Sequence, residues 1–251
     1  MTNFTAPYAA VWDAIYGEPA FVAAQIAFLE TVLAGAAGPW LDVGCGTGRH
    51  LLPLRALDHA AVGLDLSGAM LVVARVRLRE AGLQTALVRG DVTAAPFTAA
   101  FGAVLCLDSL LPLLTNDGAL AAALTEMRRL LRPGGLLALE IYDFPGTLGE
   151  NPPLWPYTSR FSAAWGRVFV RETHDYDQAA GLWRMRQEIT AVRDETWEQF
   201  AVEHLLRIRP ADAYAAALEA AGFTILQLLP FYPNAPDHAD EQRMIFVAQT
   251  K

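Results

Sequence analysis

Cysteine is scarce in this chain: its 251 residues include two, Cys45 and Cys106. Both lie in apolar or glycine-rich stretches, which argues against a disulfide framework and favours a reduced, cytoplasmic setting. The first residues, "MTNFTAPYAAV", lack the basic region and the long apolar core of a secretory signal peptide. No apolar run reaches about 18 residues without a charge, so the sequence predicts no membrane span and no membrane partner.

Basic residues are also few. Lysine and arginine together number 19 against 27 aspartates and glutamates, which gives a net charge of −8 at pH 7. Nucleic-acid-binding domains present a basic face, so this balance argues against a nucleic-acid partner. No group of His, Cys and Asp residues has the spacing of metal ligands, and no metal is expected. Hydrophobic residues, by contrast, make up 53% of the chain, enough for one large core or two modest ones.

Apolar runs and helical patterns alternate over the first 143 residues. Strands are predicted at 40–43, 60–66, 84–91, 101–108 and 136–143, and helices at 19–36, 49–57, 67–82 and 117–131. Alternation of this kind indicates βαβ units, which build an α/β fold with a mainly parallel sheet and helices on both faces. A helix at 210–223 and strands at 224–232 and 243–250 are predicted to end the chain.

The pattern changes after Asp143. The segment 144–157 contains four prolines and two glycines and is predicted to be a loop. Three alternating segments follow, at about 163–176, 182–193 and 196–208, with turn residues between them. They predict a three-stranded antiparallel extension laid across the α/β core. We therefore expect residues 1–251 to form a single domain with an insertion at about 151–209.

The stretch "LDVGCGTGRH" (41–50) places three glycines directly after a predicted strand. Ligands of open α/β sheets bind at the carboxyl ends of the strands, where glycine lets the backbone approach and a helix N-terminus offers free N–H groups. The spacing G-x-G-x-G differs from the dinucleotide fingerprint G-x-G-x-x-G and from a P-loop. Alone, the loop is equally compatible with a tight strand-to-helix turn.

Acidic residues follow the next two predicted strands. Asp65 ends the second strand, about twenty residues after the glycine loop, where a carboxylate can accept both hydroxyls of a ribose. Asp91 ends the third strand, where an adenine edge would lie. Each acid taken singly is also explained as a helix cap or a loop residue, but three such features on consecutive strands favour a nucleoside site.

With these residues the sequence resembles the class I S-adenosylmethionine-dependent methyltransferases. "LDVGCGTGRH", "VGLDLSGAML", "VRGDVT" and "LRPGG" match successive motifs of that family, most specifically within 40–143. The resemblance implies a Rossmann-like, seven-stranded, mostly parallel sheet and S-adenosyl-L-methionine as cofactor. The cofactor-binding residues implied by the resemblance are Tyr16, Asp42, Gly44, Gly46, Gly48, Asp65, Leu66, Met70, Asp91, Val92 and Leu107.

The resemblance also implies which part of the cofactor each of these residues contacts. The three glycines would line its methionine part, and Asp42 would hold its ammonium. Asp65 would bind the ribose hydroxyls, and Met70 would flank the adenine. Asp91 would accept the adenine amino group while the backbone N–H of Val92 meets a ring nitrogen. Many relatives carry an acid near the start of the fourth strand, where this chain has Gly102.

The chain further resembles small-molecule methyltransferases that carry antiparallel strands over the active site. The resemblance rests on "LCLDSLLPLL" after the fourth strand and "VEHLLR" in the extension. Where those relatives often have an Asn-Tyr pair, this chain has Leu111 and Pro112. The aromatic segment "YAAVWDAIY" resembles their opening helix, so residues 1–18 are predicted to form a lid over the cofactor.

Three residues are candidates for catalysis. Asp108 follows the fourth strand and can orient the acceptor or take its proton, or it can simply cap a turn. Tyr142 ends the fifth strand and is otherwise an ordinary strand-end residue. His204 shares an apolar face with its neighbours and is otherwise a buried core histidine.

The predicted function is methyl transfer from S-adenosyl-L-methionine to a nitrogen or oxygen atom of a small molecule. Two alternatives remain open at this point: methylation of a protein or a nucleic acid, and a non-catalytic cofactor-binding regulator. The sequence predicts neither the acceptor nor the oligomeric state.

Overall fold

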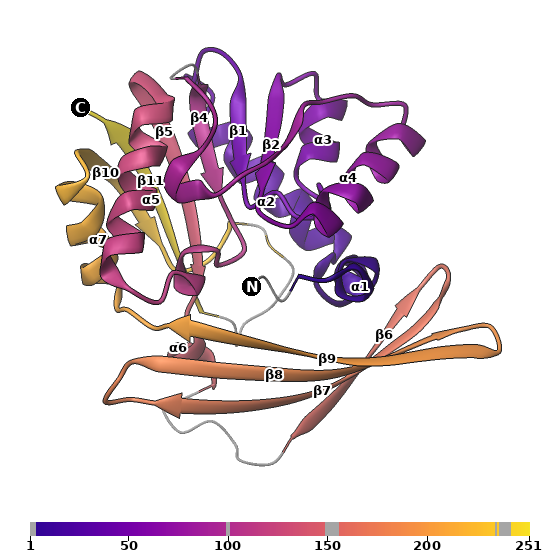
Figure 1. Ribbon diagram of the computed structural model, residues 1–251. Coiled ribbons are helices and arrows are strands. Elements are labelled where there is room, and N and C mark those ends of the chain that lie inside the picture. The colour runs from indigo at the N-terminus through magenta and orange to yellow at the C-terminus, as the bar shows by residue number, and fades with distance from the viewer. Residues whose placement is uncertain (1–3, 99–100, 149–155, 234, 236–241) are drawn as a thin grey trace.

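The computed structural model describes residues 4–98, 101–148, 156–233, 235 and 242–251. They form two β-sheets with helices around the first (Figure 1). Sheet A contains seven strands in the order β10-β11-β5-β4-β1-β2-β3, and sheet B contains four. Within the described residues, no helix is both long enough and apolar enough to cross a membrane.

Sheet A confirms the predicted seven-stranded α/β sheet. Its strands are β1 (Trp40–Val43), β2 (Ala61–Asp65), β3 (Leu87–Arg89), β4 (Phe101–Cys106), β5 (Leu131–Tyr142), β10 (Phe223–Leu229) and β11 (Arg243–Thr250). β11 runs antiparallel to both of its neighbours, while the pairs among β1 to β5 are parallel. Every residue of β1 and β4 is buried, as expected for central strands covered on both faces.

Helices cover both faces of sheet A, as predicted. They are α2 (Pro19–Val32), α3 (Leu51–Ala56), α4 (Gly68–Glu80), α5 (Asp117–Leu130) and α7 (Ala211–Ala220). One core cluster joins α5 and α7 to one face, and a second joins α2 and α3 to the other. Ser67 caps α4 by accepting a hydrogen bond from the Met70 N–H at 3.2 Å. This cap fixes the start of the helix beside the end of β2.

Sheet B confirms an antiparallel extension and corrects its size from three strands to four. The strands are β6 (Tyr157–Ala163), β7 (Gly166–Asp177), β8 (Leu182–Arg193) and β9 (Thr196–Arg207), joined in chain order. β6 begins at the end of the predicted proline-rich loop, and that loop also contains the short helix α6 (Phe144–Leu148). The predicted start of the insertion, at about 151, lies outside the described residues.

Helix α1 (Ala6–Tyr16) lies between the two sheets (Figure 1). Its buried Tyr8 and Val11 form a third apolar cluster with residues of β7, β8 and β9. The predicted aromatic helix is therefore present, and its apolar packing is against sheet B. Polar contacts described below join it to the loop after β1, so α1 connects the two halves of the molecule.

Candidate functional site

The glycine loop after β1 has a backbone that favours glycine. Gly44, Gly46 and Gly48 have φ angles of 73°, 53° and 77°, in the left-handed region. At Gly44 a Cβ atom would lie 2.3 Å from the Cδ1 atom of Leu110, so a side chain there would also clash. The three glycines therefore allow the tight turn that follows β1. Their role in binding the cofactor stays a prediction.

Asp65 lies at the end of β2, with its carboxylate turned toward the glycine loop. Its two oxygens accept hydrogen bonds from the backbone N–H groups of Gly46 (2.9 Å) and Ser67 (2.7 Å). Burial raises the pKa of Asp65, and these two hydrogen bonds offset part of that rise. The carboxylate is therefore held in a defined orientation beside the loop.

The residues expected around an adenine lie at the ends of β2 and β3. Asp91 caps a short 3₁₀ turn, because its Oδ1 accepts hydrogen bonds from the N–H (2.8 Å) and the hydroxyl (2.7 Å) of Thr93. Met70 and Val92, which follow these two strands in the sequence, are buried, whereas Leu66 is exposed. The capping role of Asp91 leaves its second carboxylate oxygen available to a ligand.

Asp42, on β1, is the least satisfied carboxylate of the site. It is buried, and its Oδ2 atom has no hydrogen-bond partner among the described residues. Burial, together with the nearby charges of Asp108 and Asp65, raises the pKa of Asp42 to about 8, although Arg49 acts in the opposite direction. A buried carboxylate oxygen without a partner is costly, so a hydrogen-bond donor, and above all a cationic one, would be bound favourably at this position.

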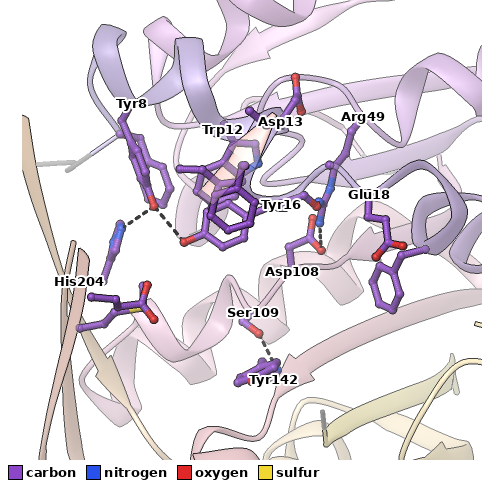
Figure 2. A pocket seen from close by; sticks show the side chains of 18 of the residues that line it. Tyr8, Trp12, Asp13, Tyr16, Glu18, Arg49, Asp108, Ser109, Tyr142 and His204 are labelled. Atoms are coloured by element: carbon purple, nitrogen blue, oxygen red, sulfur yellow. Dashed lines mark hydrogen bonds and ion pairs between the residues drawn. The ribbon is translucent and has the colours of Figure 1, made fainter. Parts of the chain in front are cut away.

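Asp108 follows β4 and forms an ion pair with Arg49 (Figure 2). Burial alone would raise the pKa of Asp108, but Arg49, His50 and Arg243 lower it to about 2. A carboxylate with so low a pKa is a weak base. The geometry therefore favours the orienting role considered for Asp108 and argues against its role as the group that takes a proton.

The turn after β4 has an unusual backbone conformation. Asp108 and Ser109 both have left-handed φ angles, 55° and 61°, which non-glycine residues adopt rarely. The Ser109 hydroxyl accepts a hydrogen bond from the backbone N–H of Tyr142 at 2.6 Å. This contact joins the ends of β4 and β5 and places the two candidate residues Asp108 and Tyr142 on the same rim.

Polar contacts fasten α1 to the glycine loop. Asp13 accepts a hydrogen bond from the Thr47 hydroxyl at 2.7 Å and pairs with Arg77 at 2.8 Å. Arg49 donates to the backbone carbonyl of Tyr16, and the Ser67 hydroxyl donates to that of Phe4 at 2.7 Å. These contacts tie the N-terminal segment to the glycine loop. That residues 1–18 form a lid over the cofactor stays a prediction.

A pocket of about 750 Å³ lies between α1, the ends of β4 and β5, and sheet B (Figure 2). It brings together all three catalytic candidates of the sequence, together with Tyr16. Its lining includes Phe4, Tyr8, Trp12, Asp13, Tyr16, Arg49, Asp108, Ser109, Tyr142, Phe144, Arg160, Glu172, His174, Met185, His204 and Arg243. Aromatic and ionisable side chains dominate this wall.

A hydrogen-bond network joins α1 to sheet B along the pocket. The Tyr8 hydroxyl donates to Gln187 Oε1 at 2.8 Å, and Gln187 Nε2 donates to the Tyr16 hydroxyl at 2.6 Å. His204 Nε2 lies 3.3 Å from the Tyr8 hydroxyl. Burial lowers the pKa of His204 to about 4, and burial with the charge of Glu172 raises that of Tyr16 to about 12. Both side chains are therefore neutral near pH 7.

A second part of this network was not predicted from the sequence. Glu172 accepts hydrogen bonds from His174 Nε2 at 2.9 Å and from Gln187 Nε2, and Trp183 Nε1 donates to His174 Nδ1 at 2.8 Å. Glu172 and His174 alternate along β7 and face the pocket. This alternation is the one signal in the sequence that could have pointed to them.

Comparison with known proteins identifies the family. A family model described as a methyltransferase domain matches residues 41–135. A relative from Streptomyces venezuelae, dTDP-3-amino-3,4,6-trideoxy-alpha-D-glucopyranose N,N-dimethyltransferase, is 30% identical over 223 residues that cover 87% of this chain and 90% of that protein. The chain belongs to the class I S-adenosylmethionine-dependent methyltransferases. It is an enzyme that uses S-adenosylmethionine as its methyl donor.

Solved methyltransferase structures are similar over both sheets. DesVI of Streptomyces venezuelae superposes with a TM-score of 0.81 at 26% identity, over 97% of this chain and 98% of that one. S-adenosylmethionine-bound CalS10, an amino pentose methyltransferase from Micromonospora echinaspora, gives a TM-score of 0.74 at 25% identity, over 98% and 97%. The family model ends before sheet B, but these two similarities include it.

The residues of this methyltransferase fit the cofactor. The Oδ2 of Asp42, which has no partner among the described residues, suits the ammonium of the methionine part. At Gly46, the nearest atom to an added Cβ is the Gly44 carbonyl oxygen at 3.9 Å, so the backbone there leaves room for a ligand. Asp65 and Asp91 lie at the ends of adjacent strands, in the order that ribose and adenine require. The individual roles expected for these residues, and for Leu66 and Leu107, remain predictions.

Proposed function

We propose that this methyltransferase methylates the amino nitrogen of a small molecule, and that an amino sugar carried on a nucleotide is the acceptor to test first. The observation that carries the proposal is similarity over the whole chain, including sheet B, to proteins whose names state an amino-sugar acceptor. A match limited to the cofactor half would be consistent with methylation of any acceptor. Similarity across the acceptor half restricts the proposal to a small molecule.

The pocket is consistent with such an acceptor. Its volume of about 750 Å³ is in the usual range for small-molecule sites. Aromatic rings from α1 offer apolar contact to a sugar ring, and Glu172 offers an acceptor for polar groups. Arg160 is exposed at the same pocket and supplies a positive charge for the phosphates of a nucleotide.

The chemistry asks mainly for alignment. When bound, S-adenosylmethionine supplies a methyl group that is already electrophilic. The chain must hold the acceptor in line with that methyl group and exclude water, a proximity effect worth at most about 7–11 kcal/mol. We assign Asp42, Asp65 and the glycine loop to the cofactor. Asp108, neutralised by Arg49, orients the rim of the pocket, and α1 with sheet B closes it.

Mass spectrometry tests the proposal directly. The purified enzyme would be incubated with S-adenosylmethionine and dTDP-3-amino-3,4,6-trideoxy-α-D-glucopyranose, beside the same nucleotide sugar with a hydroxyl at C3. We expect one or two methyl groups to appear on the amine and none on the hydroxyl compound. Methylation of the hydroxyl compound alone would make the enzyme an O-methyltransferase. Methylation of neither would reject a nucleotide-sugar acceptor.

A further inference from the structure

One wall of the pocket is a stripe of aromatic rings on α1. Tyr8, Trp12 and Tyr16 are four residues apart, so they lie on one face of the helix. The ring centroids of Tyr8 and Trp12 are 5.3 Å apart, and those of Trp12 and Tyr16 are 4.5 Å apart. All three rings line the pocket. We call these three residues the aromatic stripe.

Sheet B contributes Glu172 to the pocket and holds it in a fixed orientation. Trp183 donates its N–H to His174 Nδ1, so that nitrogen is an acceptor and the ring proton is on Nε2. His174 Nε2 therefore donates to Glu172 Oε1, and Gln187 donates to Oε2. The His174 side chain is 1% exposed and that of Glu172 is 14% exposed. The imidazole is thus a buried support for a carboxylate that still reaches the pocket.

Two of the three other carboxylates that line the pocket are held by arginine, and the third is Glu18. Asp108 pairs with Arg49, and Asp13 pairs with Arg77. Glu172 is oriented by an imidazole and an amide, and Gln187 also bonds Tyr16 of the aromatic stripe. An anionic carboxylate is therefore directly connected, through one amide side chain, to the set of aromatic rings on α1.

This juxtaposition is the chemistry that recognises an alkylammonium group. An N–H of a protonated amine forms a charge-assisted hydrogen bond with a carboxylate. Aromatic faces attract the same cation and contact the methyl or methylene carbons attached to its nitrogen. A hydroxyl can also donate a charge-assisted hydrogen bond to the carboxylate, but it carries no charge of its own. It therefore gains neither the ion-pair attraction to Glu172 nor the cation–π attraction to the rings.

We propose that Glu172, together with the aromatic stripe, selects an amino group over a hydroxyl group in the acceptor. The amine binds as an ammonium ion, and one N–H proton passes to the Glu172 carboxylate before the nitrogen lone pair attacks the methyl group. The proposal rests on the function proposed above and adds to it the residue that determines specificity. It also predicts that a monomethylated amine remains a ligand, because the added methyl group meets the aromatic stripe. Trp183 and His174 are positioning residues, which act through the orientation of Glu172.

Binding calorimetry tests the selection without turnover. Three nucleotide sugars are titrated into the enzyme in the presence of S-adenosylhomocysteine: one with an amine at C3, one with a hydroxyl there, and one with an acetamido group. We expect the wild type to bind the amine at least about tenfold more tightly than the hydroxyl compound, because only the amine gains both an ion-pair attraction and a cation–π contact. Glu172→Gln should bring the two affinities within about threefold.

Matched variants control for folding and for general effects. Glu188→Gln makes the same change on the adjacent strand, where Glu188 pairs with Arg171 on the other face of sheet B, and should leave the preference unchanged. Glu172→Asp keeps the charge and should retain part of the preference. S-adenosylhomocysteine affinity and the melting temperature report whether each variant is folded.

The outcomes separate this proposal from the proposed function. A wild type that neither binds nor methylates the amine contradicts both. A wild type that methylates the amine, with a Glu172→Gln variant that still prefers it to the same degree, overturns the assignment of Glu172 alone. Should Glu172→Gln fail to fold, the calorimetry on the wild type tests the proposal. Equal affinity of the wild type for the amine and for the uncharged acetamide would exclude recognition of charge.

Discussion

The two halves of the active site are built in different ways. The cofactor half is formed by residues close together in the sequence: Asp42 lies on β1, the glycine loop follows β1, and Asp65 ends β2. The acceptor half is assembled from distant residues, since the hydrogen bonds of Tyr8 join residues 179 and 196 positions apart. Local chain geometry determines the first half, and docking of α1 on sheet B determines the second.

The halves also differ in how well their polar groups are satisfied. In the cofactor half, Asp42 leaves a buried oxygen without a partner among the described residues. In the acceptor half, Gln187 and His174 each use both polar ends of their side chains. The unsatisfied oxygen of Asp42 can be satisfied by a charged ligand. The satisfied network of Gln187 and His174 instead keeps the side chains of the pocket in place. We therefore expect substitutions in the two halves to have separable effects.

The largest expected effect lies where the halves meet, at the ion pair of Asp108 and Arg49. Asp108→Asn leaves a buried guanidinium without its counter-charge, and we expect a loss of about 3 kcal/mol in the free energy of unfolding. Arg49 also bonds the carbonyl of Tyr16, so the lid should loosen as well. Urea unfolding measures the loss, and Arg49→Met added to Asp108→Asn should recover part of it.

The same pair predicts a pH dependence of stability. Asp108 has a pKa of about 2 in the folded chain, below its usual value near 4. Its contribution is therefore fully present above pH 4 and is lost as the pH falls toward 2. The difference in unfolding free energy between wild type and Asp108→Asn should be constant at neutral pH and shrink over that acidic window. An equally large difference at pH 2 would contradict the pairing.

Sequence patterns predicted the cofactor half well because each of its features is local. Apolar runs located all seven strands of sheet A, and the acids at the strand ends were assigned by their position in those runs. The number of strands in sheet B was wrong by one. The strand that was missed is β6, which begins at Tyr157, the last residue of the predicted loop. Pro152, Pro153 and Pro156 indicated a loop, and the strand directly after them was therefore not recognised.

The contacts of the acceptor half could not be predicted from the sequence. The two-residue alternation of a strand shows which face of the sheet a side chain is on, but not which residue of another element it contacts. Gln187 shares its face with other residues of β8, and only the register of sheet B and the docking of α1 bring it to Tyr8, Tyr16 and Glu172. Asp108 was correctly placed on the rim. Its ion pair with Arg49 was missed, because Arg49 lies within the glycine motif and was assigned to the start of a helix.

Asp65→Ala is expected to have the next largest effect and to sharpen the separation of the halves. Removing the carboxylate should weaken S-adenosylmethionine binding by about 1.5–3 kcal/mol, roughly 10- to 150-fold. Glu172→Gln, in the acceptor half, should change that affinity by less than about twofold. Calorimetry on both variants makes the comparison. Equal losses in the two would show that the halves are not separable, and an unchanged Asp65→Ala affinity would reject the ribose assignment.

A fourth prediction concerns the protonation of Asp42. With a pKa of about 8, Asp42 is protonated in the unliganded enzyme at pH 6 to 7, while an ammonium ligand requires its carboxylate form. Binding should therefore release a proton, and S-adenosylmethionine affinity should rise by up to about tenfold per pH unit as pH increases from 6. The rise should end near pH 8, where an α-amino group itself loses its proton.

Calorimetry in buffers with different heats of ionisation counts the released protons. Asp42→Asn is the matched variant, and its affinity should be nearly independent of pH over the same range. Affinity that rises equally in both proteins would assign the titration to another group. Affinity that is flat in the wild type would show that Asp42 does not receive the ammonium.

The smallest effect is expected at the contact between α1 and the glycine loop. Asp13→Ala removes a hydrogen bond to Thr47 and a partly exposed ion pair to Arg77, together worth about 1 kcal/mol, or about fivefold in affinity. The loss should appear in the dissociation rate of S-adenosylmethionine if α1 acts as the predicted lid, because the contact fastens α1 to the glycine loop. Asp175→Ala, which removes a more exposed and longer ion pair to Arg184, serves as the control. If Asp13→Ala lowers only the affinity for the acceptor and leaves cofactor dissociation unchanged, α1 belongs to the acceptor half alone. The contact between Asp13 and Thr47 then marks the border between the two halves.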